Sequence, residues 1–230
     1  MLIHNKTNTV SDILNIYVNK VKLTQIDHVK YLGVWIDETL KWHHHVNTVC
    51  KNLNKKLGML SRVSKILPLK SLLCTYKSFI SPSFDYADTI WHPCNKYLSN
   101  KIQILKNRAA RIICNNFDYV NTRGIDLVKQ LKHHSTYERR EYNMCTLIYK
   151  CIHGKVPNYL CDNIIMACDV HKYGTRQAES MNLYIPNAKN KIIRDSLFFQ
   201  GANLWNSLPS FVKESPSIES FKRNYLKIKR

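Results

Sequence analysis

Two carboxylates, Asp85 and Asp88, lie in the segment FDYADT at residues 84–89 and suggest metal-dependent chemistry. Two-metal phosphoryl transfer needs several converging carboxylates, but Thr89 follows Asp88 where a Tyr-x-Asp-Asp tetrad would supply its second aspartate. The neighbouring apolar residues recur at three- and four-residue steps, which is typical of a helix and not of a catalytic hairpin: Phe79, Ile80, Phe84, Ala87, Ile90 and Trp91. We expect Asp85 and Asp88 to share a helix face without forming a catalytic site.

Other chemistries find equally little support in the sequence. Zinc sites pair cysteines two to four residues apart and add a matching second pair, whereas Cys161 and Cys168 stand further apart and His171 adds one further ligand. Adjacent histidines at residues 43–45 point apart on a helix. No Gly-x-Ser-x-Gly elbow or Gly-rich phosphate loop occurs. We expect no catalytic residue, metal ligand or cofactor in this chain, with a zinc-containing nucleic-acid module as an alternative.

The charge of the chain indicates its partner. Lys and Arg outnumber Asp and Glu by 35 to 16, which gives a formal net charge of +19. So basic a chain favours a polyanion, most naturally nucleic acid. The chain has no long apolar run or secretory leader, and its eight cysteines are irregularly spaced, so we expect reduced thiols, no membrane partner and an intracellular protein, nuclear or cytoplasmic.

Hydrophobic periodicity predicts a small sheet followed by many helices. Residues 13–36 alternate apolar and polar side chains, which predicts two or three antiparallel strands with turns at residues 19–20 and 25–28. Helical spacing begins near Trp42 and ends before Pro68, where a second helix starts that Pro82 interrupts. Further helices are predicted at residues 98–114, 135–152, 191–206 and 218–228, with a looser stretch at 172–186 that contains a short strand at 183–185. The expected fold class is mainly α with a small N-terminal antiparallel β-hairpin or sheet (α+β).

The order of several motifs resembles one family. They are HVKYLGVWID at 28–37, LKW at 40–42, YKSFI at 76–80, NRAARI at 107–112, RREYNM at 139–144, YGTR at 173–176 and GANLWNSLP at 201–209. In this order they resemble the C-terminal part of a jockey-like LINE (non-LTR) retrotransposon reverse transcriptase. The resemblance implies an end-of-palm and primer-grip β segment at residues 1–41, a thumb-like helical bundle at 42–153 and an element-specific helical region at 154–230.

The same resemblance implies a function. The polymerase carboxylates of the family precede these motifs, so Mg²⁺ is expected only in a full-length relative, and this chain would hold template–primer nucleic acid without incorporating nucleotides. Its partners would be RNA or an RNA–DNA duplex, and the palm and fingers of the same polyprotein. Lys30, Tyr31, Leu32 and Gly33 match the primer grip. The alternative is an inert structural or protein-interaction remnant of a degraded mobile element.

Basic residues at helical spacing are the other candidates for binding. In the helix at 98–114, an apolar arc predicts a core face, while Lys101, Arg108 and Arg111 fall on one flank. Such a row would bind phosphates in a salt-sensitive, sequence-independent way, or be only a solvated face. Arg139 with Arg140, and Lys51 with Lys55 and Lys56, have the same two interpretations.

Two features of the predicted strands remain open. Gly33 would mark either a bulge or a backbone that another group approaches closely. Tyr31 and Trp35 are expected to be core or half-core aromatic residues.

Overall fold

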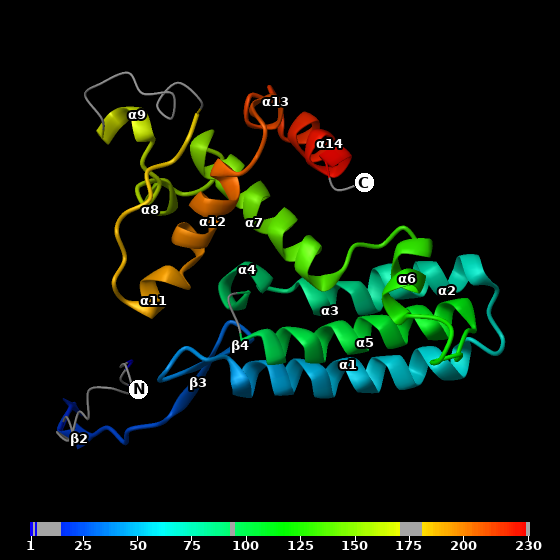
Figure 1. Ribbon diagram of the computed structural model, residues 1–230. Coiled ribbons are helices and arrows are strands. Elements are labelled where there is room, and N and C mark those ends of the chain that lie inside the picture. Colours follow the sequence, from blue (N-terminus) through cyan, green and yellow to red (C-terminus); the bar gives the residue numbers. More distant parts are fainter. Residues whose placement is uncertain (2, 4–14, 93–94, 171–180, 229–230) are drawn as a thin grey trace. The chain divides into compact units, whose positions relative to one another are not determined.

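The computed structural model describes residues 1, 3, 15–92, 95–170 and 181–228 (Figure 1). The chain forms two compact units, of which the first comprises Met1–Ala87 and Cys94–Ser135 and the second Asp88–Pro93 and Thr136–Arg230. The described part is mostly helical with two small antiparallel hairpins, so the predicted fold class is confirmed. The division at residues 41 and 153 rests on the resemblance and stays a prediction. The contacts place Ser135 at the end of the first unit and Thr136 in the second, together with the earlier residues 88–93.

Two hairpins lie near the N-terminus of the first unit. β1 (Tyr17–Val18) pairs with β2 (Val21–Lys22), and β3 (His28–Tyr31) pairs with β4 (Val34–Asp37). The predicted turn at residues 19–20 is confirmed by positive φ angles at both residues. The placement of Gly33 within a strand was wrong, because Leu32 and Gly33, with φ of 45° and 85°, form a two-residue turn between β3 and β4. Residues 13 and 14 of the predicted strand region lie outside the described residues.

Asp37 joins the second hairpin to the long helix α1 (His43–Val63), which begins one residue after the predicted Trp42. Its carboxylate accepts hydrogen bonds from the backbone N–H groups of Thr39, Lys41 and Trp42 and from the Thr39 hydroxyl. Burial raises the pKa of Asp37, but these hydrogen bonds outweigh it, so the pKa lies below its ordinary value. Asp37 thereby fixes the turn that leads into α1.

Pro82 does not interrupt the second helix as predicted. The chain continues through α2 (Leu69–Thr75), the π-helix η1 (Tyr76–Ile80) and α3 (Ser81–Asp85). The buried residues of this run are spaced by four: Leu72, Tyr76, Ile80 and Phe84. Such a stripe drifts around an α-helix of about 3.6 residues per turn, and the wider π turn offsets that drift. Phe79, which the helical spacing groups with the buried Ile80 and Phe84, is 45% exposed.

The helix α5 (Lys96–Cys114) completes the core of the first unit. The Asn95 side chain caps it by accepting a hydrogen bond from the backbone N–H of Tyr97. Its predicted apolar arc is confirmed, since all of its members are buried: Ile102, Leu105, Ala109, Ile112 and Ile113. The helix packs against α1 on one side and against α6 (Gly124–Gln130) on another (Figure 1).

The second unit is organised around α7 (Thr136–Ile152), which contacts α4 (Asp88–Trp91), α8 (Asn158–Cys161), α12 (Leu197–Asn206) and α14 (Ile218–Ile228). Short helices α9 (Ala167–Val170), α11 (Lys191–Arg194) and α13 (Ser210–Lys213) complete it. Its core contains Ile148, Tyr149, Trp205, Phe221 and Tyr225.

The GANLWNSLP motif explains how α12 packs. A Cβ atom on Gly201 would lie 2.8 Å from Cδ1 of Ile148, so only glycine lets α12 approach α7 this closely. The Asn206 amide accepts a hydrogen bond from the N–H of Leu183 and donates one to its carbonyl.

Two predictions for the second unit need correction. The helix at 191–206 is broken, because Ser196 caps a new helix by accepting a hydrogen bond from the N–H of Phe199. The strand at 183–185 is a single bridge between Leu183 and Met166. Of the looser stretch at 172–186, residues 172–180 lie outside the described residues.

Candidate nucleic-acid interface

The helical character predicted for residues 84–89 is confirmed, but one helix does not span them. α3 ends at Asp85, Ala87 adopts a φ of 52°, and α4 begins at Asp88. Asp85 and Asp88 therefore do not share a helix face, and they belong to different units. Asp88 is buried and accepts a hydrogen bond from Nδ2 of Asn143 over 2.7 Å. Within the described ranges, no three His, Cys, Asp or Glu side chains are grouped to hold a metal ion.

Tyr86, from the same segment, supports the tip of the second hairpin. Its hydroxyl donates a hydrogen bond to the carbonyl of Leu32 over 2.6 Å. A Cβ atom on Gly33 would lie 3.4 Å from Cε1 and from the hydroxyl oxygen of Tyr86. The group that approaches Gly33 closely is thus a tyrosine of the same chain.

The tip of this hairpin is exposed while its base packs on α1. Tyr31 is 64% and Leu32 76% exposed, so the expectation that Tyr31 is a core or half-core residue was wrong. Trp35 is half-buried as expected. The ring centroids of Trp35 and His28 lie 4.7 and 4.3 Å from that of His44, and the backbone N–H of Trp35 donates a hydrogen bond to Nδ1 of His45. Lys30, Tyr31 and Leu32 are therefore presented to solvent on an anchored hairpin.

The neighbouring helices α1 and α5 contain no acidic residue. Both lie wholly within the described residues, and together they carry nine cationic side chains: Lys51, Lys55, Lys56, Arg62, Lys96, Lys101, Lys106, Arg108 and Arg111. Neither helix can therefore form the pairs of opposite charge, three or four residues apart, that stabilise a helix and offset such cations. The helix pair therefore concentrates positive charge without internal neutralisation.

Two matched hydrogen bonds define how these helices lie. Nζ of Lys101 donates to Oδ1 of Asn47 over 3.2 Å, and Nη1 of Arg108 donates to Oδ1 of Asn54 over 3.0 Å. Both pairs are 54 residues apart, so α1 and α5 run parallel along this seam. Because the asparagine partners are neutral, these hydrogen bonds do not offset the positive charges of Lys101 and Arg108.

Further cations lie beside this seam on α1. Lys51 follows Asn47 by one helical turn and Lys55 follows Lys51 by another, which places them on the same side of the helix. Arg62 follows two turns later, and all three side chains are exposed. We call Lys51, Lys55, Arg62, Lys101 and Arg108 the cationic face. Sequence reasoning missed Asn47, Asn54 and Arg62; the seven-residue spacing shared by Asn47–Asn54 and Lys101–Arg108 was the available signal.

Two cations expected near this face have other partners. Arg111 is only 5% exposed, and its guanidinium donates hydrogen bonds to the carbonyls of Asn116, Asp118 and Thr122. Nζ of Lys56 donates to the carbonyl of Phe79 and to the hydroxyl of Ser83. The structure thus brings Lys101 and Arg108 together on the surface and places Arg111 beneath a loop.

Arg139 and Arg140 belong to the second unit. Arg140 is 1% exposed, and its guanidinium lies 4.1 Å from the centroid of the Trp91 ring. The guanidinium of the half-buried Arg139 lies 5.5 Å from the Tyr142 ring centroid. The contact of Arg140 with Trp91 stabilises the packing of α4 on α7.

None of the cysteines in the described ranges forms a disulfide: Cys50, Cys74, Cys114, Cys145, Cys151, Cys161 and Cys168. Sγ of Cys161 donates to the carbonyl of Val156, and Sγ of Cys168 to the carboxylate of Asp169. Cys94, His171 and the YGTR motif lie outside the described residues. In the described part of the chain, we find no helix with the length and hydropathy needed to cross a bilayer.

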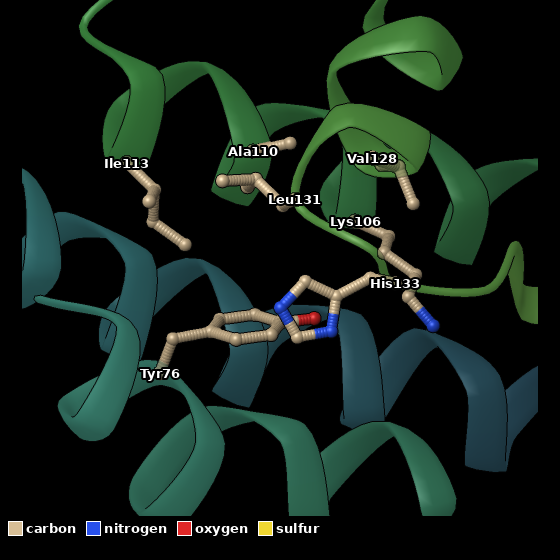
Figure 2. Close-up of a pocket in the computed structure, with 7 residues that line it drawn as sticks. All are labelled: Tyr76, Lys106, Ala110, Ile113, Val128, Leu131 and His133. Atoms are coloured by element: carbon tan, nitrogen blue, oxygen red, sulfur yellow. The ribbon is translucent and has the colours of Figure 1, made fainter. Parts of the chain in front are cut away.

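A small pocket in the first unit is lined by seven residues (Figure 2): Tyr76, Lys106, Ala110, Ile113, Val128, Leu131 and His133. The rings of Tyr76 and His133 meet edge to face, with centroids 5.1 Å apart. Its free volume of about 10 Å³ admits about one water molecule. This pocket is therefore too small for a nucleotide or a cofactor.

Comparison with known proteins identifies relatives of the chain. It is 33% identical to the probable RNA-directed DNA polymerase from transposon X-element of Drosophila melanogaster over 103 residues, 43% of this chain and 11% of the relative. It is 30% identical to the probable RNA-directed DNA polymerase from transposon BS of the same species over 122 residues, 52% of this chain and 13% of the relative. The chain is homologous to retrotransposon RNA-directed DNA polymerases.

A third relative, the RNA-directed DNA polymerase from mobile element jockey of Drosophila funebris, is 26% identical over 123 residues, which are 52% of this chain and 13% of the relative. The resemblance to jockey-like reverse transcriptases is thereby confirmed. The matched segments span only about an eighth of each of these relatives. No family model and no solved structure matches the chain.

Proposed function

We propose that this chain is a portion of a retrotransposon reverse transcriptase that holds template–primer nucleic acid and does not itself catalyse nucleotide incorporation. The observation that carries the proposal is the pair of acid-free helices, α1 and α5, with the exposed cationic face along their seam. Homology to RNA-directed DNA polymerases supports nucleic acid as the polyanion that this face binds.

The cationic face suits the phosphate backbone. Lys and Arg beside phosphates displace condensed counterions, so affinity falls steeply with salt and depends little on base sequence. Asn47 and Asn54 hold Lys101 and Arg108 in place through neutral hydrogen bonds, which reduces the side-chain entropy lost on binding. Arg111 and Arg140, being buried, would act by supporting the fold and not by touching phosphates.

The exposed hairpin tip is the second proposed contact. Lys30, Tyr31, Leu32 and Gly33 match the primer grip in the resemblance, and Tyr86 holds the tip in one conformation. We assign to it a contact with the primer strand near its 3′ end. The catalytic carboxylates and Mg²⁺ would come from the palm of the polymerase, and none of the proposed contact residues is acidic.

Binding measurements at several salt concentrations test the proposal. The purified chain should bind an RNA–DNA duplex with a log–log slope of about −4 if most of the five cations contact phosphates. The double variant Lys51→Gln/Lys55→Gln should reduce the steepness of this slope by about two. Arg223→Gln/Lys227→Gln removes the same charge from α14 in the second unit and serves as the matched control.

Equal losses in both double variants would show that net charge alone attracts the duplex and would contradict a defined face. Incorporation of deoxynucleotides by the chain with Mg²⁺ would contradict the non-catalytic role.

The exposed apolar hairpin favours the second candidate, a protein-interaction remnant. The side chains of Tyr17, Val18 and Val21 in β1 and β2 are 53% to 66% exposed. Such a surface suits contact with another protein segment. A remnant of this kind would bind nucleic acid weakly and without a steep salt slope, so the titration above distinguishes the two candidates.

A further inference from the structure

The loop at residues 115–123, which joins α5 to α6, is held firmly although it lies on the surface. On the interior side of the loop, the buried guanidinium of Arg111 donates hydrogen bonds to the carbonyls of Asp118 and Thr122 over 2.8 and 2.6 Å. It also donates to the carbonyl of Asn116 over 3.4 Å. Within the loop, the Asp118 carboxylate accepts hydrogen bonds from the N–H groups of Val120 and Asn121 and from Nδ2 of Asn121. These bonds fix the backbone of the loop in one conformation.

This fixed loop presents large apolar side chains to solvent. Phe117 is 52%, Tyr119 70% and Val120 91% exposed. The Arg111 guanidinium carbon lies 4.2 Å from the Tyr119 ring centroid, so a cation covers one face of the ring and orients it. The remainder of the ring is accessible. A rigid exposed ring binds a flat partner at low entropic cost, because it is already ordered.

The loop lies at one end of the cationic face. Lys101 pairs with Asn47 and Arg108 with Asn54 at a constant offset of 54 residues. At the last residue of α5, this offset places Leu60 of α1 at the level of Cys114, so Arg62 lies at the end of the seam from which the loop starts. The exposed Arg123 adds a further cation, while the carboxylate of Asp118 is engaged by bonds within the loop. A strand whose phosphates follow the face would therefore reach Tyr119 beyond Arg62.

We propose that Tyr119 is a stacking site for an unpaired base of a nucleic-acid strand whose neighbouring duplex lies on the cationic face. Stacking of bases on aromatic side chains tolerates any sequence, because every base has a π face. The ligand is thus a duplex with a single-stranded extension, of RNA or DNA. Arg111 is a positioning residue, which orients the ring and holds the loop. This inference rests on the proposed function, because the duplex must first bind the face.

The test compares two probes on the full chain: a blunt RNA–DNA duplex and the same duplex with a short overhang that carries 2-aminopurine. In the wild type, the overhang should raise affinity about tenfold and its fluorescence should be quenched by stacking. Tyr119→Ala and Tyr119→Leu should abolish both effects, while Tyr119→Phe, which retains the ring, should preserve them. Tyr159→Ala, at a 68% exposed tyrosine of the second unit, is the matched control and should change neither.

Each outcome decides the inference. If the blunt duplex binds with the expected salt dependence but Tyr119→Leu keeps the full gain from the overhang, the stacking site is refuted and the proposed function stands. If the blunt duplex shows no salt-sensitive binding, both fail together. Arg111→Lys should lower the quenching and leave blunt-duplex affinity unchanged; equal loss on both probes would show that Arg111 supports the fold as a whole and would contradict its role in orienting the Tyr119 ring.

Discussion

The phenol of Tyr86 donates a hydrogen bond to the carbonyl of Leu32 over 2.6 Å and lays its ring against Gly33. Leu32 has a φ of 45°, which is unfavourable for any residue with a Cβ atom, because Cβ then lies too close to the following carbonyl oxygen. Gly33 supplies the second positive φ without that cost. The tyrosine of FDYADT therefore has a structural role at the hairpin tip.

Replacing Tyr86 with Phe removes this hydrogen bond and keeps the ring. Because the bond is exposed, we expect global stability to fall by less than about 1 kcal/mol. The tip itself should open more often, so amide hydrogen exchange at residues 30–35 should accelerate. Tyr159→Phe, at another exposed tyrosine, is the control. Unchanged exchange at the tip in Tyr86→Phe would show that the turn holds without the hydroxyl.

The long amphipathic helices were predictable because their signal is local. The apolar period that defines α1 and α5 located the first residue of both helices to within two positions. The Leu32–Gly33 turn was missed because the apolar Leu32 continues the strand pattern, and its support comes from Tyr86, 54 residues away. The burial of Arg111 could not be predicted either. Helical spacing indicates on which side of the helix a residue lies, but it does not show whether a loop covers that side.

The close packing of α12 on α7 leads to a prediction at Gly201. In Gly201→Ala, the new methyl group would lie within 3.0 Å of Cδ1 and Cγ1 of Ile148, which is fully buried and cannot move aside freely. We expect a destabilisation of about 1–3 kcal/mol from overpacking. Urea unfolding monitored by circular dichroism measures it. Adding Ile148→Val, which removes Cδ1, should recover part of the loss in a double-mutant cycle.

Gly58→Ala provides the opposite case and a control for Gly201→Ala. Gly58 lies inside α1, and a methyl group on its Cα would meet no atom within 4 Å beyond the backbone of its own helix. Alanine there should stabilise the first unit by about 0.4–1 kcal/mol, because it restricts the unfolded chain. If both alanine variants were destabilised equally, the specific contact with Ile148 would not explain the effect at Gly201.

Asp37 predicts a local response to acid. Its folded-state pKa is depressed, so the carboxylate binds its proton less readily in the folded than in the unfolded chain. The stability that it contributes is present above the unfolded pKa of about 3.9 and is lost as pH falls through the folded value. NMR of the Thr39, Lys41 and Trp42 amides should show this loosening below about pH 4. In Asp37→Asn, these amides should exchange with solvent faster at neutral pH, and the loosening below about pH 4 should be absent.

His92 predicts a pH response of the second unit at milder acidity. Burial, followed by the nearby Arg140 guanidinium, lowers the pKa of His92 to about 4, and its ring meets Tyr137 edge to face. The unfolded histidine has a pKa of about 6.5. Between about pH 4 and 6.5, His92 is therefore protonated in the unfolded chain and neutral in the folded chain. Stability is therefore complete above about pH 6.5 and falls toward pH 4, by at most about 3 kcal/mol.

A comparison of variants isolates this contribution, because other histidines also titrate. His92→Phe keeps an aromatic ring in the site but cannot be protonated, so its stability should vary less between pH 6.5 and 4 than that of the wild type. Urea unfolding at several pH values gives both curves, with His43→Phe at an exposed histidine of the first unit as the control. Parallel curves for the wild type and His92→Phe would mean that His92 accepts its proton in the folded chain.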